Sequence, residues 1–80
     1  MFQLVRLVLN ERHQVVARMA LQPLFDLRED AMAMAEFSAA RSSDDFDYDR
    51  DSDCWRATES NGRTIRFVVE PTGLGASLAA

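Results

Sequence analysis

The segment from Cys54 to Pro71 constrains the fold most strongly, because two runs of strand-forming residues flank Asn61-Gly62 there. This dipeptide between apolar runs is the strongest short-range signal for a β-hairpin. The hairpin carries the single tryptophan of the chain and several of its largest apolar side chains. The remaining segments must therefore cover one of its faces.

The length of the loop sets the register of this hairpin. A two-residue loop would place Arg56 on the apolar face, whereas a three-residue loop pairs Trp55 with Phe67 and moves Arg56 and Arg66 to the opposite face. A one-residue slip turns every side chain of a strand to the other face. The separation of apolar from charged residues therefore predicts the three-residue loop, with Gly62 left-handed in a bulge.

A second hairpin is predicted near the N-terminus, from the short apolar runs 2–9 and 15–21 with a polar segment between them. A five-residue loop pairs Leu9 with Val15, and a four-residue loop fits nearly as well. The five-residue register also places Arg6 opposite Arg18. One long helix over residues 4–21 is the alternative, which the valines and the lack of a steady 3.6-residue period disfavour.

Pro23 predicts the end of the second strand, and a helix is predicted from Asp26 to about Arg41. Asp26 and Glu29 have the spacing of a capping box. In this motif the Asp26 side chain accepts a hydrogen bond from the amide three residues on, and the Glu29 side chain accepts one from the amide of Asp26. The predicted buried stripe consists of Leu27, Ala31, Met34, Ala35 and Ser38, with Phe37 beside it.

Residues 42–53 contain six aspartates, and Phe46 and Tyr48 alternate with them, as in a short strand or a packed loop. The alternate acids invite a calcium hypothesis, because hard oxygen ligands at such spacing bind Ca²⁺. An EF-hand-type loop would need glycine at Arg50 and glutamate at Arg56. We therefore predict no metal site, with weak divalent binding as the alternative for Asp45, Asp47, Asp49 and Asp51.

These elements predict an α+β fold of order ββαββ, in which one helix packs on one face of a four-stranded antiparallel sheet. The apolar face of the helix requires such a sheet. We expect residues 1–71 to form one small domain and residues 72–80 to form a flexible tail.

The net charge of −4 disfavours nucleic acid as a partner, because phosphate binding requires a basic surface. All nine basic residues are arginine, as expected for a bacterial-type chain from a GC-rich genome. No apolar run is long enough to span a membrane, and the N-terminus lacks the basic leader of a signal peptide. With one cysteine and no internal disulfide, the expected location is the cytoplasm.

No catalytic residue and no cofactor site are predicted. His13 falls in a predicted surface loop and Cys54 in a distant strand, where it is expected to be half-buried. Neighbouring aspartates should raise the pKa of the Cys54 thiol and weaken it as a nucleophile. The glycines near the C-terminus do not follow a strand or precede a helix, so they do not form a phosphate-binding loop.

The sheet face away from the helix is the predicted contact surface, and its candidate partner-binding residues are Arg6, Arg18, Arg56 and Arg66. The function predicted is a small, non-catalytic binding or assembly module, with a protein partner or a second copy as a homodimer. One alternative is a small enzyme or enzyme subunit that uses His13 and surface acids, which a pocket joining His13 with two acids would favour. Another is an acidic decoy that binds a basic protein surface.

Overall fold

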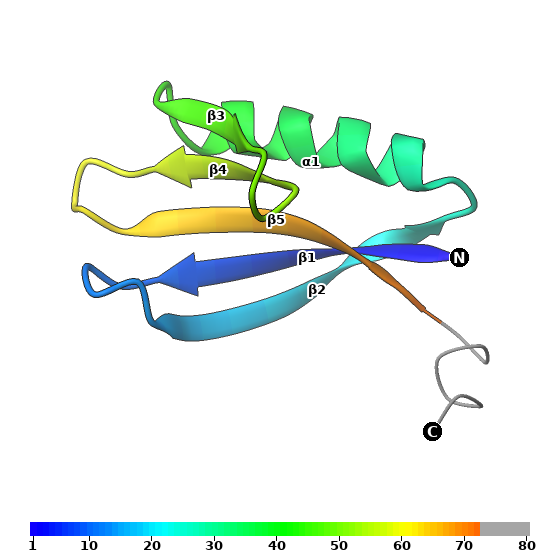
Figure 1. The fold of residues 1–80 in the computed structure, drawn as a ribbon, viewed down its shortest axis with the longest axis horizontal. Coiled ribbons are helices and arrows are strands. Elements are labelled where there is room, and N and C mark those ends of the chain that lie inside the picture. The colour runs from blue at the N-terminus through cyan, green and yellow to red at the C-terminus, as the bar shows by residue number, and fades with distance from the viewer. Residues whose placement is uncertain (73–80) are drawn as a thin grey trace.

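The computed structural model describes residues 1–72, which form one antiparallel sheet with a single helix on one of its faces (Figure 1). The elements along the chain are β1 (Phe2–Leu9), β2 (Val15–Phe25), α1 (Arg28–Ser42), β3 (Phe46–Asp49), β4 (Cys54–Thr58) and β5 (Thr64–Pro71). The sheet order is β2-β1-β5-β4-β3. The predicted α+β class and the ββαββ arrangement are thus confirmed in outline, but the sheet has five strands.

The fifth strand is β3, which pairs with β4 at the edge of the sheet. Phe46 and Tyr48 turn toward the helix side and pack at a tilt against Trp55, with ring centroids 6.3 and 5.5 Å from the Trp55 ring. Asp47 and Asp49 turn to the other face. The alternation of aromatic residues and aspartates therefore marked a strand. Of the predicted tail, only Thr72 is described, and residues 73–80 lie outside the described part of the chain.

The hairpin of β4 and β5 has the predicted register. Trp55 pairs with Phe67, and Arg56 pairs with Arg66 on the opposite face. Gly62 has a φ of +86°, as the left-handed bulge position requires. β5 also pairs with β1 along its whole length and therefore occupies the middle of the sheet.

The helix begins two residues later than predicted. Its N-cap is Leu27, which makes no side-chain capping bond, so the predicted capping box of Asp26 and Glu29 is wrong. Asp26 precedes the N-cap and does not bond to the free amides of the first turn. The charges still match the helix dipole, with Glu29 in the first turn and Arg41 in the last.

The buried row of the helix consists of alanines, Ala31, Ala35 and Ala39. Ala35 and Ala39 pack on the large strand side chains of the core. Leu27, Met34 and Phe37 are exposed, so the predicted stripe is rotated from the observed one. Small side chains let the helix lie close to the sheet, where Leu4, Ile65 and Phe67 already fill the space.

The hairpin of β1 and β2 starts as predicted, with Leu9 opposite Val15, but a β-bulge follows at once. The bulge shifts the register by one residue, so that Arg6 lies opposite Met19 and not opposite Arg18. Arg6 also lies opposite Phe67 of β5, which puts it on the helix side of the sheet. Arg6 therefore does not share a face with the three other predicted contact arginines.

β2 does not end at Pro23 but continues to Phe25. A second irregularity in the pairing with β1 lies between Leu21 and Phe25, around Pro23. Proline is tolerated there because β2 is an edge strand, whose outer N–H groups need no partner within the sheet. The helix lies mainly over β5, β4 and β1, so β2 stays largely uncovered (Figure 1).

Candidate functional site

Arg18, Arg56 and Arg66 share the sheet face away from the helix, which we call the arginine face. Arg18 pairs with Glu70 at 2.5 Å. Because Arg18 lies opposite Leu7 and Glu70 lies opposite Gln3, this ion pair crosses β1 above Val5. The pair thereby covers Val5, which is fully buried although no helix lies on this face.

Arg56 is also paired within the chain. Its Nε and one Nη donate to the two carboxylate oxygens of Asp47 at 3.0 and 2.7 Å, and Asp49 lies 3.8 Å from the other Nη. Two parallel hydrogen bonds of this kind fix the guanidinium as well as neutralise it. The hydrogen bonds that Arg56 donates to Asp47 raise the pKa of Arg56 above its ordinary value.

Arg66 differs from both, because no acid of residues 1–72 forms an ion pair with it. Its one side-chain hydrogen bond in the described chain is a long contact of 3.5 Å to the Ser52 hydroxyl. Its Nε is buried without a hydrogen-bond partner. Arg66 is therefore the arginine of this face whose donors are least used.

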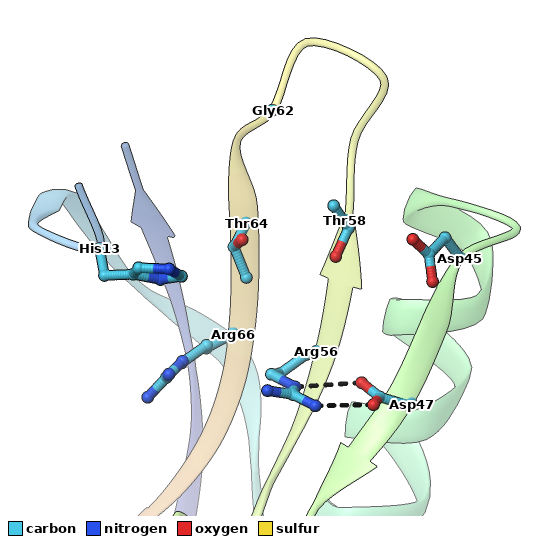
Figure 2. A pocket seen from close by; sticks show the side chains of 8 residues that line it. All are labelled: His13, Asp45, Asp47, Arg56, Thr58, Gly62, Thr64 and Arg66. Carbon is cyan, nitrogen blue, oxygen red and sulfur yellow. Dashed lines mark hydrogen bonds and ion pairs between the residues drawn. The ribbon is translucent and has the colours of Figure 1, made fainter. Parts of the chain in front are cut away.

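A cavity of about 390 Å³ opens on the arginine face beside Arg66 (Figure 2). Its lining comes from both hairpins and from the start of β3, and consists of His13, Asp45, Asp47, Arg56, Thr58, Gly62, Thr64 and Arg66. The cavity brings His13 together with two acids, which is the feature that would favour the enzyme hypothesis. Sequence reasoning did not foresee it, because it depends on β1 lying beside β5.

The acids and the histidine are not arranged as a catalytic pair. His13 and Asp45 line opposite sides of the cavity (Figure 2), with β5 and β4 between them. The three strand spacings from β1 to β3 amount to about 14 Å, which is beyond the reach of a direct hydrogen bond between the two side chains. Asp47 is occupied by Arg56.

Cys54 lies outside the cavity lining and is fully buried, rather than half-buried as predicted. Burial raises the pKa of its thiol, and the charges of Asp49 and Asp53 act in the same direction against Arg66 and Arg56. The direction of the shift agrees with the prediction, but desolvation is its main cause. The structure does not bring Cys54 and His13 together.

Two aspartates of the connection, Asp47 and Asp53, are held by side chains of the same chain. Asp53 accepts hydrogen bonds from Tyr48 and from Arg28 of the first helical turn. The Tyr48 bond, with Arg28 beside it, lowers the pKa of Asp53. Within residues 1–72, no three histidine, cysteine or acidic side chains lie close enough together to hold a metal ion.

The outer edge of β2 is a second candidate surface. Val15, Val16 and Met19 are each more than half exposed, and Arg18 is the one charged residue of the strand. The opposite edge of the sheet, β3, has four residues, two of which are aspartates. A long apolar edge strand is a template for pairing with another chain, whereas a short charged one resists it.

Comparison with known proteins adds no relative: no family model, no curated protein and no solved structure matches this chain. No helix among residues 1–72 is both long and apolar enough to cross a membrane. The functional argument therefore rests on the arginine face, its cavity and the β2 edge.

Proposed function

We propose that this chain is a small, non-catalytic assembly module that forms a homodimer by pairing β2 of one copy with β2 of a second. The exposed apolar edge of β2 is the observation that carries this proposal. The proposed partner is protein rather than nucleic acid or membrane. We place the module in the cytoplasm, where a single buried thiol such as Cys54 stays reduced.

The backbone of β2 supports the proposal first. β1 pairs with one side of the strand, so the N–H and C=O groups that point to the other side have no partner in the sheet. A second copy, placed antiparallel, would supply partners for these groups and continue the sheet from one subunit into the other. Pro23 limits the pairing segment to residues before it, because proline has no N–H to donate.

The side chains of β2 support a two-fold arrangement, in which the same edge serves both copies. A two-fold axis at Met19 would set Met19 against the partner's Met19 and Arg18 against the partner's Ala20. An axis at Arg18 would set two like charges directly opposite each other, so we propose the register centred on Met19. Glu70 already neutralises Arg18 in its own chain, which reduces the remaining repulsion.

The arginine face supports dimerisation less well than the β2 edge. Dimerisation through this face would be favoured if its arginines needed acids from a second copy. Arg18 and Arg56 have acidic partners within the chain, so that need does not arise for them. These exposed pairs each contribute only about 0–1 kcal/mol, and they leave no charge that demands a partner.

The assembly proposal is tested by measuring mass in solution with two matched variants. Met19→Lys places a charge at the proposed axis, and Met34→Lys places the same charge on the exposed side of the helix. We expect sedimentation to give a dimer for the wild type at high micromolar concentration, a monomer for Met19→Lys and a dimer for Met34→Lys. A monomeric wild type, or a dimer that survives Met19→Lys, would refute the β2 interface.

A small enzyme or enzyme subunit that uses His13 is the second candidate, because the cavity joins His13 with Asp45 and Asp47. We rank it lower because His13 makes no side-chain hydrogen bond within residues 1–72 that would orient it as a base. The acidic decoy also ranks lower, since Asp47 and Asp53 are paired with arginines of the same chain.

A further inference from the structure

We propose that the cavity on the arginine face binds a carboxylate group, with Arg66 as its principal ligand. The ligand class is a small molecule or chain end with one carboxylate and a neutral or cationic remainder. This inference is independent of the assembly proposal, because the cavity residues do not belong to β2.

The first argument is the unused donor capacity of Arg66. A guanidinium has five N–H donors in a planar fork, and one long contact to Ser52 uses little of it. A carboxylate matches this fork with two parallel hydrogen bonds. Leaving the Nε–H buried without a partner costs free energy, because the donor has lost its water and gained no acceptor. A ligand that turns the guanidinium toward the cavity would remove that cost.

The second argument is the set of neighbouring donors. Thr58 and Thr64 form a directly opposed pair on β4 and β5, and both line the cavity. Neither hydroxyl donates a side-chain hydrogen bond within residues 1–72, and the same holds for the ring of His13. Figure 2 shows the His13 ring on the same side of the cavity as Arg66. The cavity therefore offers several free donors around one free positive charge.

The third argument is charge balance, which selects among anions. Arg56 and Asp47 neutralise each other, so Arg66 is the one positive charge of the lining that has no acidic partner in the described chain. Asp45 lies across the cavity and repels a second negative charge (Figure 2). A monovalent carboxylate matches the single unpaired positive charge of Arg66. The second negative charge of a phosphate dianion would have no cation to pair with and would be repelled by Asp45.

The proposal is tested by following backbone amide signals during titration with N-acetylglycine, which carries a single carboxylate. N-acetylglycinamide is the neutral probe of nearly the same shape, and inorganic phosphate is the multivalent probe. We expect saturable shifts at His13, Thr64 and Arg66 with N-acetylglycine, weaker binding of phosphate and no binding of the amide.

Matched variants separate Arg66 from its surroundings. Arg66→Gln should weaken N-acetylglycine binding at least about tenfold, as expected for the loss of a charge-assisted bidentate pair. Arg66→Lys keeps the charge without the fork and should retain part of the affinity. Arg63→Gln changes an exposed arginine of the same hairpin outside the cavity lining and should bind like the wild type.

Three results would overturn the carboxylate site: no saturation with N-acetylglycine, equal binding of its amide, or unchanged binding by Arg66→Gln. Phosphate binding tighter than N-acetylglycine would overturn the ligand class. The titration is repeated on Met19→Lys, where we expect the same affinity. A negative result for the dimer would then leave the carboxylate result intact, and a negative result for the carboxylate site would leave the dimer result intact.

Discussion

The two hairpins of this protein have loops of the same length and backbone geometry, but their strands differ in burial. In each, three residues separate the closing pair, which is Asn10 and Gln14 in the first and Glu59 and Arg63 in the second. The same two backbone hydrogen bonds, of 2.9 to 3.0 Å, close both loops. The third loop residue is left-handed in both, but it is His13 in one and Gly62 in the other. Loop geometry therefore does not explain why only one hairpin keeps a regular register.

The strands explain the difference. Ile65 and Phe67 of the second hairpin lie under the helix and are almost fully buried, so a slip of one residue would expose them. In the first hairpin, the helix covers little of β2, and the side chains of residues 15–20 are exposed on both faces of the strand. Little is lost when β2 bulges after Val15 and again around Pro23. Regular pairing is maintained where burial penalises a slip.

The largest expected effect compares two residues that flank Arg6 on the same sheet face, Phe67 and Met19. Phe67→Ala should cost about 3–5 kcal/mol, because it empties part of the core. Met19→Ala should cost less than about 1 kcal/mol, since Met19 is 56% exposed. Denaturant unfolding of dilute, monomeric protein measures both. Comparable losses at the two positions would contradict the assignment of β2 as an uncovered strand.

The next effect compares the two left-handed loop positions. Gly62→Ala should cost about 1–3 kcal/mol, because a φ of +86° is strained for any residue with a Cβ. The added Cβ would lie 3.4 Å from the Glu11 side chain, so the strain comes from the backbone more than from crowding. His13→Gly should leave the melting temperature unchanged or raise it.

Ser60→Ala lies in the same loop as Gly62 and serves as the control for a substitution without backbone strain. A melting temperature for Gly62→Ala equal to that of Ser60→Ala would show that the loop tolerates a Cβ. In that case, the presence of glycine in only one hairpin would have no energetic meaning.

The same contrast shows which parts of the fold could be predicted from sequence. The register of β4 and β5 could be, because Asn61-Gly62 fixes the turn and only one register separates Arg56 and Arg66 from the apolar side chains. The bulge in β2 could not be, because consecutive apolar residues at 15–17 look alike in either register. The misplacement of Arg6 followed from that bulge.

The candidate site was predictable in part for the same reason. The common face of Arg56 and Arg66 depends on one hairpin and was predicted. The approach of His13 to that face depends on the pairing of β1 with β5, which no local pattern specifies. The start of the helix was predicted to within two residues, but its buried face was not. Large residues such as Met34 and Phe37 were expected to be buried, whereas small alanines occupy the narrow contact with the sheet.

A smaller effect is expected at alkaline pH from Cys54, which lies in the regular hairpin. Burial raises the pKa of its thiol above the unfolded value, so the neutral form stabilises the fold. This contribution is complete below the unfolded pKa of about 8.5 and is lost as pH rises through the folded pKa. Relative to Cys54→Ala, the wild type should therefore lose stability above about pH 8.5.

Thiol labelling extends this test to the first hairpin. Cys54 should react slowly with a thiol reagent, because access to it requires opening of the structure. In Met19→Cys, Cys54→Ala, the single thiol lies on the uncovered strand and should react at nearly the rate of a small free thiol under conditions that keep the chain monomeric. Fast labelling of Cys54 in the wild type would show that the second hairpin opens as readily as the first.

The smallest effect is expected from calcium, which probes the acidic connection between the helix and the second hairpin. We predict that millimolar Ca²⁺ leaves the amide signals of residues 44–53 unchanged apart from general salt effects. The physical reason is that two of the acids which alternate along this segment, Asp47 and Asp53, are already held by different partners. Asp47 is held by Arg56, and Asp53 by Tyr48 and Arg28. A cation would have to displace arginines from these carboxylates before several of them could turn toward one ion.

Arg56→Gln removes one of these competitors and provides the sharper test of calcium binding, because it frees Asp47 beside Asp45 at the edge of the cavity. Saturable shifts in that variant alone would mean that the arginine face prevents cation binding, whereas saturable shifts in the wild type at micromolar Ca²⁺ would show that the connection is a metal site despite its ion pairs.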